Sequence, residues 1–123
     1  MSHANLKLRD PGYVRSVDRW FAAQSGTGET EVPPMFTPFR LREMTLANRV
    51  AVSPMCMYSA KDGLPGEFHR VHYGNLARGG AGLVFTEMTD VTPDGRISPG
   101  CTGLWSDAHT AAWKHVLDGA RAN

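Results

Sequence analysis

The sequence predicts an α/β fold, because two short apolar runs flank a segment with helical periodicity. The first run, Arg49–Ser53, contains Val-Ala-Val without interruption, and the second is Ala81–Met88. Between them, Glu67–Gly80 carries apolar residues at helical spacing. A strand, a helix and a strand of this length imply two parallel strands joined by a right-handed crossover. Such a unit belongs to an open doubly wound sheet or to a barrel, and periodicity does not choose between them.

Residues 1–34 are predicted to form a helix followed by a linker. The helix, Tyr13–Gln24, repeats apolar residues every three or four positions, which indicates one buried face. These residues are Val14, Val17, Trp20 and Phe21. The stretch Ser25–Pro34 is rich in Gly, Thr and Glu and ends in a proline pair, so we expect a flexible linker that stiffens toward its end. We place a domain boundary here, with residues 35–123 as the second segment.

Within residues 35–123, two short strands around a turn at Arg42–Thr45 are expected to precede the strand Arg49–Ser53. The continuous apolar run in that strand predicts cover on both faces. The helix Glu67–Gly80 is expected to bury one face and to end at its glycine pair. That face is formed by Phe68, Val71, Tyr73 and Leu76.

The last part of the sequence predicts a turn and a helix. Thr92–Ile97 is predicted to form a turn, because Pro93 fixes its own φ angle and Gly95 tolerates positive φ. The final segment, Ser106–Ala122, predicts a helix with Ser106 as N-cap, an acidic residue in the first turn and Arg121 near the end.

Composition excludes several classes of function. The chain has 123 residues, the size of one domain, with 41% hydrophobic and 20% charged residues, which is typical of a globular protein. A net charge of +1 gives no basic surface for nucleic acid or an anionic membrane. We expect no membrane span and no secretion signal, since no apolar run is long enough. Two cysteines, Cys56 and Cys101, without an export signal indicate a reduced, cytoplasmic protein.

A candidate ligand site follows the first predicted strand. In parallel α/β folds, ligands bind at the carboxyl ends of the strands, where Ser53–Tyr58 and Glu87–Thr89 should lie side by side. Each residue also has a simpler interpretation. Cys56 can pack as a small hydrophobic residue, Met55 and Met57 can fill the core, and Tyr58 can lie at the rim with a solvated hydroxyl. We favour core filling for Met57.

Other motifs do not indicate a second site. His69 and His72 lie one helical turn apart, but two histidines without a third ligand make a poor zinc site, so we predict capping or packing and no metal. The glycines of Gly79–Gly82 lead into a strand and not into a helix, which favours close packing over phosphate binding.

From Met35 onward the chain resembles the Old Yellow Enzyme family of flavin oxidoreductases, in particular its thermophilic-like bacterial branch. The resemblance is carried by three collinear motifs: MFTPFRLREMTLANRVAVSPMCMYSA, FHRVHYGNLARGGAGLVFTEMTDVTPDGRIS and GLWSDAHTAAWKHV. A shorter resemblance, in NLKLRDPGYVRSVDRWFA, is to the junction of two-part aryl-CoA enzymes. In salicylyl-CoA 5-hydroxylase and 2-aminobenzoyl-CoA monooxygenase/reductase, an FAD monooxygenase precedes an Old Yellow Enzyme-like domain.

The resemblance implies a (β/α)8 TIM barrel with FMN at the carboxyl ends of its strands. Residues 35–123 would be the N-terminal portion of that barrel, with two of its strands. The segment beside the flavin ring would be Ser53, Pro54, Met55 and Cys56, with the Cys56 thiol at the polar edge of the ring, tuning its redox potential. Met88 would lie beside the flavin where the family often has alanine, which would reshape the substrate space. Tyr58 would donate a hydrogen bond to a substrate carbonyl.

The implied reaction is hydride transfer from NADH or NADPH through FMN to an activated C=C bond. The substrate would be a small molecule, or an aromatic acyl-CoA in the two-part enzymes, where FAD would belong only to an upstream domain. The resemblance also implies a homo-oligomer for the full-length protein.

A barrel needs about 250 residues, so we expect this chain to be a fragment that is inactive alone. Three hypotheses remain open. The first is a fragment of an aryl-CoA monooxygenase/reductase, the second is a fragment of a stand-alone ene-reductase, and the third is a small interaction module that binds no cofactor.

Overall fold

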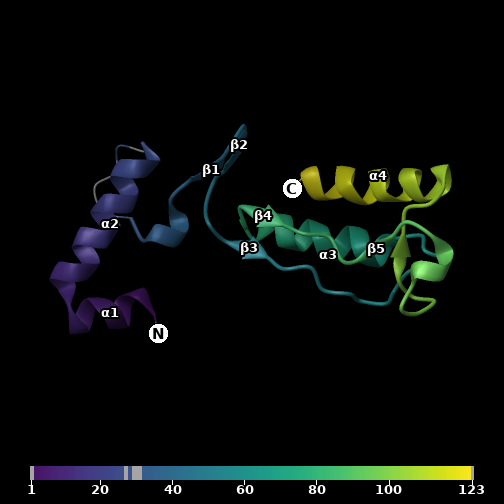
Figure 1. Cartoon of the computed structure of the whole chain (residues 1–123), viewed down its shortest axis with the longest axis horizontal. Coiled ribbons are helices and arrows are strands. Elements are labelled where there is room, and N and C mark those ends of the chain that lie inside the picture. The colour runs from purple at the N-terminus through teal and green to yellow at the C-terminus, as the bar shows by residue number, and fades with distance from the viewer. Residues whose placement is uncertain (1, 27, 29–31, 123) are drawn as a thin grey trace. The chain divides into compact units, whose positions relative to one another are not determined.

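The computed structural model describes residues 2–26, 28 and 32–122, and the chain divides into two compact units (Figure 1). The first unit is Met1–Val50 and the second is Ala51–Asn123. The boundary expected between residues 34 and 35 stays a prediction, and part of the expected linker lies outside the described residues. None of the described helices is both long enough and apolar enough to cross a membrane.

The first unit begins with two consecutive helices, α1 (His3–Arg9) and α2 (Pro11–Ser25). The second confirms the predicted helix, whereas α1 was not predicted, because seven residues are too few for a clear periodic pattern. Asp10 separates the two helices, and its carboxylate accepts a hydrogen bond of 2.9 Å from the Tyr13 amide. Gly26, with a φ of 66°, ends α2 in the left-handed conformation.

The buried face of α2 differs from the predicted one at Trp20. Val14, Asp18 and Ala22 are buried, but Trp20 is 58% exposed. The position of Trp20 on the apolar face was therefore a wrong prediction. The physical reason is the neighbouring helix α1, whose His3 Nε2 lies 2.9 Å from an oxygen of the Asp18 carboxylate. Because His3 supplies a polar partner, the side chain of Asp18 can lie on the buried face of α2, whereas Trp20 lies outside it.

A short hairpin follows in the first unit. A 3-10 turn, η1 (Pro34–Phe36), leads into strands β1 (Phe39–Leu41) and β2 (Met44–Leu46), which pair antiparallel as predicted. The turn is shorter than expected, because Thr45 already belongs to the second strand. Arg42 occupies the turn with a φ of 53°.

The side chain of Arg49 holds this unit together. Its guanidinium carbon lies 4.9 Å from the ring centroid of Phe21 in α2 and 5.1 Å from that of Phe39 in β1. It also donates hydrogen bonds of 3.0 Å to the Thr37 hydroxyl and to the Pro38 carbonyl. The guanidinium of Arg49 therefore contacts α2, β1 and the two residues between η1 and β1.

The second unit contains the predicted strand–helix–strand crossover. Strands β3 (Ala51–Val52) and β4 (Leu83–Val84) pair in parallel, and helix α3 (Glu67–Arg78) connects them. Both strands are shorter than predicted, and the first ends before Pro54, which has no amide for a ladder. Ala51 is exposed, so the prediction that this strand is covered on both faces was wrong.

A second parallel pair was not predicted. Strands β5 (Thr89–Asp90) and β6 (Thr102–Gly103) contain two residues each, too few for any sequence periodicity. Between them, the predicted turn contains the 3-10 helix η2 (Pro93–Gly95). Gly95 is not among the residues with positive φ, so the reason given for this glycine was wrong.

Helix α4 (Asp107–Arg121) confirms the last predicted helix. Ser106 takes the N-cap position, but its hydroxyl does not bond the helix amides. It lies 2.7 Å from Nδ1 of His109 instead, three residues along the same helix.

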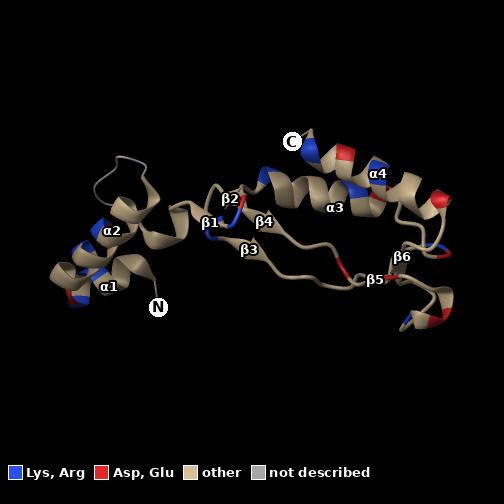
Figure 2. Cartoon of the chain, turned by 45° about the horizontal axis from the view of Figure 1, so that its top comes forward, with Lys and Arg blue, Asp and Glu red and all other residues tan. Residues whose placement is uncertain are grey.

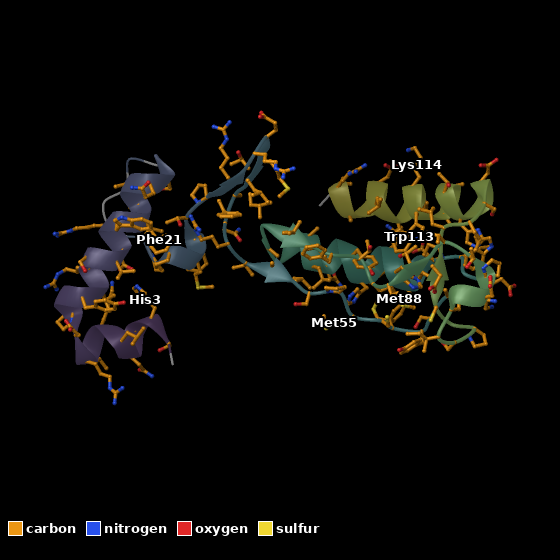
Figure 3. The ribbon with its side chains drawn as sticks, viewed as in Figure 1. His3, Phe21, Met55, Met88, Trp113 and Lys114 are labelled. Carbon is orange, nitrogen blue, oxygen red and sulfur yellow. The ribbon has the colours of Figure 1, made fainter. Side chains whose placement is uncertain are left out.

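The core of the second unit lies between α3 and α4, which run side by side (Figure 1). Tyr73, Trp113 and Val116 are its buried members. Trp113 projects from α4 toward α3 (Figure 3), and its indole nitrogen donates a hydrogen bond of 3.1 Å to the Gly103 carbonyl. The core therefore joins both helices to strand β6.

The buried face of α3 is also displaced from the predicted one. Phe68 and Val71 are 52% and 53% exposed, so their assignment to the buried face was wrong. The buried face is formed by His69, Tyr73 and Gly74. A polar histidine takes this place because both of its ring nitrogens have nearby polar partners.

Candidate functional site

Two segments leave the parallel pair at its carboxyl end and run along each other (Figures 1 and 2). Ser53–Ala60 follows β3, and Phe85–Met88 follows β4. They are joined at their start, where the Phe85 amide donates a hydrogen bond of 3.1 Å to the Val52 carbonyl. The first segment carries no charged residue, and Glu87 is the single charged residue of the second. This is the position at which parallel α/β folds bind ligands.

The structure places all of the predicted site residues on these two segments. Ser53, Pro54, Met55 and Tyr58 are exposed, whereas Cys56 and Met88 are partly buried. Met55 is 57% exposed and Tyr58 50%. Figure 3 shows Met55 and Met88 on the segments after β3 and β4. Met57 packs against the core, which confirms the interpretation favoured for it.

The main chain at Tyr58 is held in an uncommon conformation. Its φ of 52° lies in the left-handed region, which a bulky residue adopts only when its surroundings fix it. The surroundings are provided by Gly100, whose carbonyl accepts a hydrogen bond of 3.0 Å from the Ala60 amide. A Cβ at Gly100 would lie 2.3 Å from the Tyr58 carbonyl oxygen, so only glycine fits this approach.

A tight turn anchors the end of the loop. Asp62 and Gly63 both have positive φ, 50° and 79°, as an Asp-Gly type I′ turn requires. The Gly63 carbonyl accepts a hydrogen bond of 2.8 Å from the Gly103 amide, and the Asp62 carbonyl lies 3.0 Å from Nε2 of His109. The Asp-Gly pair was the sequence signal that could have revealed this anchor.

A buried carboxylate, Glu87, fixes the middle of the loop. Its side chain is fully buried, and Oε2 accepts a hydrogen bond of 3.2 Å from the Met57 amide. The Glu87 amide in turn donates a hydrogen bond of 2.8 Å to the Tyr73 hydroxyl, and burial raises the pKa of that phenol. Sequence analysis placed Glu87 at a strand end but missed this role.

His69 fills the space between α3 and Glu87. Its Nδ1 accepts a hydrogen bond of 3.1 Å from the Gly66 amide at the start of the helix, and its Nε2 lies 3.3 Å from Glu87 Oε1. The capping and packing role predicted for His69 is confirmed. His72 stacks on Phe68 instead. In the described part of the chain, no three His, Cys, Asp or Glu side chains are grouped as metal ligands.

His69 also predicts how stability depends on pH. Burial lowers its pKa below the ordinary 6.5, against the raising effect of Glu87. As the pH falls, the imidazole of His69 is therefore protonated in the unfolded chain before it is protonated in the folded one. The contribution of neutral His69 to the free energy of unfolding is intact above pH 6.5 and is lost as the pH falls below it. We expect a loss of up to about 1.4 kcal/mol per pH unit. Urea unfolding of the wild type between about pH 7.5 and about pH 5.5 measures it.

The matched variants for this test are His69→Gln and His115→Gln. The second histidine side chain is 67% exposed, so its replacement should leave the acid dependence unchanged. His69→Gln should flatten it. An equal acid dependence in wild type and His69→Gln would contradict the assignment.

The chemistry of the exposed donors suits a planar ring with polar edges. Among the described residues, the amides of Met55 and Cys56 have no hydrogen-bond acceptor, and the Ser53 hydroxyl is exposed beside them. A tricyclic flavin presents carbonyl and ring-nitrogen atoms that accept such bonds, while its faces contact apolar side chains such as Met55. The residues present therefore fit a flavin.

An apolar pocket of about 210 Å3 lies elsewhere in the unit, against α3, α4 and β4. Its walls include Tyr73, Val84 and Leu117. These walls are side chains of core elements, and the loop residues 53–58 do not contribute to them. The pocket is therefore not the candidate site.

Residues 34–123 match the model of the NADH:flavin oxidoreductase / NADH oxidase family. An NADPH dehydrogenase from Listeria welshimeri is 46% identical over 91 residues, which are 72% of this chain and 27% of that protein. An NADPH dehydrogenase from Bacillus licheniformis is 52% identical over 77 residues, 61% of this chain and 23% of that protein. The chain thus spans about a quarter of the length of the curated relatives it matches.

Solved structures give the same picture of the backbone. Morphinone reductase in complex with tetrahydroNAD has a TM-score of 0.66 and 35% identity, over 74% of this chain and 24% of that one. The old yellow enzyme homologue from Zymomonas mobilis has a TM-score of 0.65 and 30% identity, over 73% and 25% of the two chains. The fold is therefore an α/β fragment that matches part of an Old Yellow Enzyme barrel, as the resemblance implied.

Proposed function

The chain belongs to the NADH:flavin oxidoreductase / NADH oxidase family, and on this premise we propose that it forms one wall of an FMN site in an NAD(P)H-dependent oxidoreductase. The observation that carries the proposal is the pair of exposed segments at the carboxyl ends of β3 and β4. Main-chain donors, a thiol and methionine side chains lie on these segments, whose one charged residue, Glu87, is buried. The names of the relatives, NADPH dehydrogenase and old yellow enzyme homologue, support the same chemistry.

The residues that would hold the flavin are Ser53, Pro54, Met55, Cys56 and Met88. FMN, when bound, supplies the hydride chemistry that links NADH or NADPH to the substrate. The amides of residues 55 and 56 would bond the polar edge of the ring. The Cys56 thiol, a weak donor, would tune its redox potential. Met88 would lie beside the ring and restrict the space for substrate.

Tyr58 would act on the substrate. Its phenol is 50% exposed on a main chain that cannot relax freely, which keeps the side chain at the rim of the site. A phenol donates a hydrogen bond to a carbonyl oxygen and stabilises charge that develops there. We therefore propose a small substrate with a C=C bond conjugated to a carbonyl, handled in the cytoplasm, where free cysteines such as Cys56 stay reduced.

This domain fits two kinds of enzyme. A stand-alone ene-reductase is consistent with the relatives, which are named NADPH dehydrogenases. The reductase half of an aryl-CoA monooxygenase/reductase is supported only by the resemblance in residues 5–22. In the structure these residues belong to the α1–α2 pair, within the first unit. A monooxygenase reading frame immediately upstream would favour the second kind of enzyme.

The test is a hybrid protein in which this whole chain is followed by the part of the Listeria welshimeri NADPH dehydrogenase that comes after its matched segment. We expect the purified hybrid to carry FMN, seen by its visible absorption, and to oxidise NADPH with a conjugated enone. Failure of a folded hybrid to retain FMN would contradict the proposal.

Two conservative variants of the hybrid separate the proposed roles. Tyr58→Phe removes only the hydroxyl, so it should lower turnover by about 10-fold or more while FMN stays bound. Cys56→Ala should change the flavin reduction potential and leave the FMN content unchanged. Loss of FMN in Tyr58→Phe would show that this residue does not act on substrate.

A further inference from the structure

We propose that Glu87 is a positioning residue, which fixes relative to each other the two segments that would face the flavin. The inference rests on the proposed FMN site and goes beyond it, because Glu87 itself would not touch the flavin. It concerns how this chain holds the amides of Met55 and Cys56, the Tyr58 side chain and Met88 in one geometry.

The first observation is that one carboxylate bridges both segments. Glu87 belongs to the segment after β4 and directly precedes Met88. Its Oε2 accepts the hydrogen bond from the Met57 amide, which lies in the segment after β3 between Cys56 and Tyr58. Because a side chain of one segment is bonded at 3.2 Å to the main chain of the other, a shift of one segment is transmitted to the other.

The second observation is that Glu87 is itself bonded to the helix core. Its amide donates to the hydroxyl of Tyr73, which is 4% exposed and belongs to the helix core with Trp113. The side chain is fully buried, so water does not compete for its oxygens. Glu87 therefore connects the loop to the buried core between α3 and α4.

The third observation is the orientation of His69. A main-chain amide can only donate, so Nδ1, which receives the Gly66 amide, carries no proton. In the neutral imidazole the proton then lies on Nε2, which faces Glu87 Oε1 at 3.3 Å. One carboxylate oxygen is thus turned toward the histidine, and the other is directed to Met57.

The fourth observation concerns charge. Among the described residues, no Lys or Arg forms an ion pair with Glu87, and its neighbours are a neutral imidazole and an amide. A buried carboxylate that accepts a hydrogen bond from a neutral amide and is paired with no Lys or Arg contributes direction and not net attraction between charges. This arrangement suits positioning better than a purely structural ion pair.

The experiment compares the full chain with Glu87→Ala, Glu87→Gln and Val116→Ala. Val116 is fully buried in α4 and belongs to the same core, so its truncation is the matched destabilising control. Hydrogen exchange is measured over residues 53–60 and over α4. FMN affinity is measured in the hybrid protein with the same substitutions.

We expect the Met57 amide, which loses its acceptor, to exchange about 10- to 100-fold faster in Glu87→Ala, and FMN affinity to fall with this loss of protection. Val116→Ala should accelerate exchange in α4 at least as much as in the loop. Glu87→Gln keeps a carbonyl oxygen for the Met57 amide, so it should restore part of the loop protection. If Glu87→Ala does not fold, the comparison of Glu87→Gln with the wild type still tests the inference.

Equal acceleration of the loop in Val116→Ala and in Glu87→Ala would overturn the inference. The inference would also be overturned if the loop exchanged as fast in Glu87→Gln as in Glu87→Ala. The same holds if FMN affinity were equal in the wild type and in both Glu87 variants. A folded wild-type hybrid without FMN would overturn the proposed function instead, and the exchange data would still decide whether Glu87 holds the two segments.

Discussion

Replacing Trp113 with alanine is expected to destabilise the Ala51–Asn123 unit by about 3–5 kcal/mol, the largest effect of any single truncation in this core. The side chain is 7% exposed, lies 6.1 Å from the Tyr73 ring and 6.5 Å from the His69 ring between ring centroids, and bonds the Gly103 carbonyl. Its loss leaves a cavity between α3 and α4 and an unpaired buried carbonyl. Urea unfolding of the full chain, followed by circular dichroism, measures the change.

Trp113→Phe is the matched comparison. It keeps an aromatic ring between the helices and removes the indole donor, so it should cost about 1–2 kcal/mol, less than alanine. Equal destabilisation by phenylalanine and alanine would contradict the packing role, since the hydrogen bond alone would then account for the whole effect.

Replacing Gly100 with alanine is expected to cost about 3 kcal/mol and to move the loop that carries Tyr58. The added Cβ would lie 2.3 Å from the Tyr58 carbonyl oxygen and 2.7 Å from its carbonyl carbon. Both contacts are with main chain, which cannot rotate away as a flexible side chain can. Unfolding of the full chain measures the free energy, and limited proteolysis after Tyr58 reports the loop.

The control is Gly66→Ala, because a Cβ at Gly66 would meet no atom within 4 Å and its φ of −130° suits any residue. As the N-cap of α3 it should cost about 1 kcal/mol or less. If Gly100→Ala were no more destabilising than Gly66→Ala and left the loop equally resistant to chymotrypsin, the close approach of these two chain segments would be wrong.

The elements with a long periodic pattern were predictable from the sequence. Helices α2, α3 and α4 were predicted close to their observed bounds, and so was the parallel pairing of β3 with β4. The position of Ser53–Tyr58 at the carboxyl end of the parallel pair was predictable because this segment directly follows an apolar strand. Its role in ligand binding stays a prediction. The family resemblance rested on these same residues.

The sequence by itself determined the crossover and the position of Met55, Cys56, Tyr58 and Met88 after its two strands, because local patterns specify secondary structure and its order. Only the tertiary structure decided what holds them there. The Glu87 carboxylate reaches Met57 across 30 positions of the chain, Gly100 approaches Tyr58, and His69 displaces Phe68 from the buried face of α3. Such contacts depend on which groups meet in space, and the periodic pattern of a single helix or strand does not specify the partner.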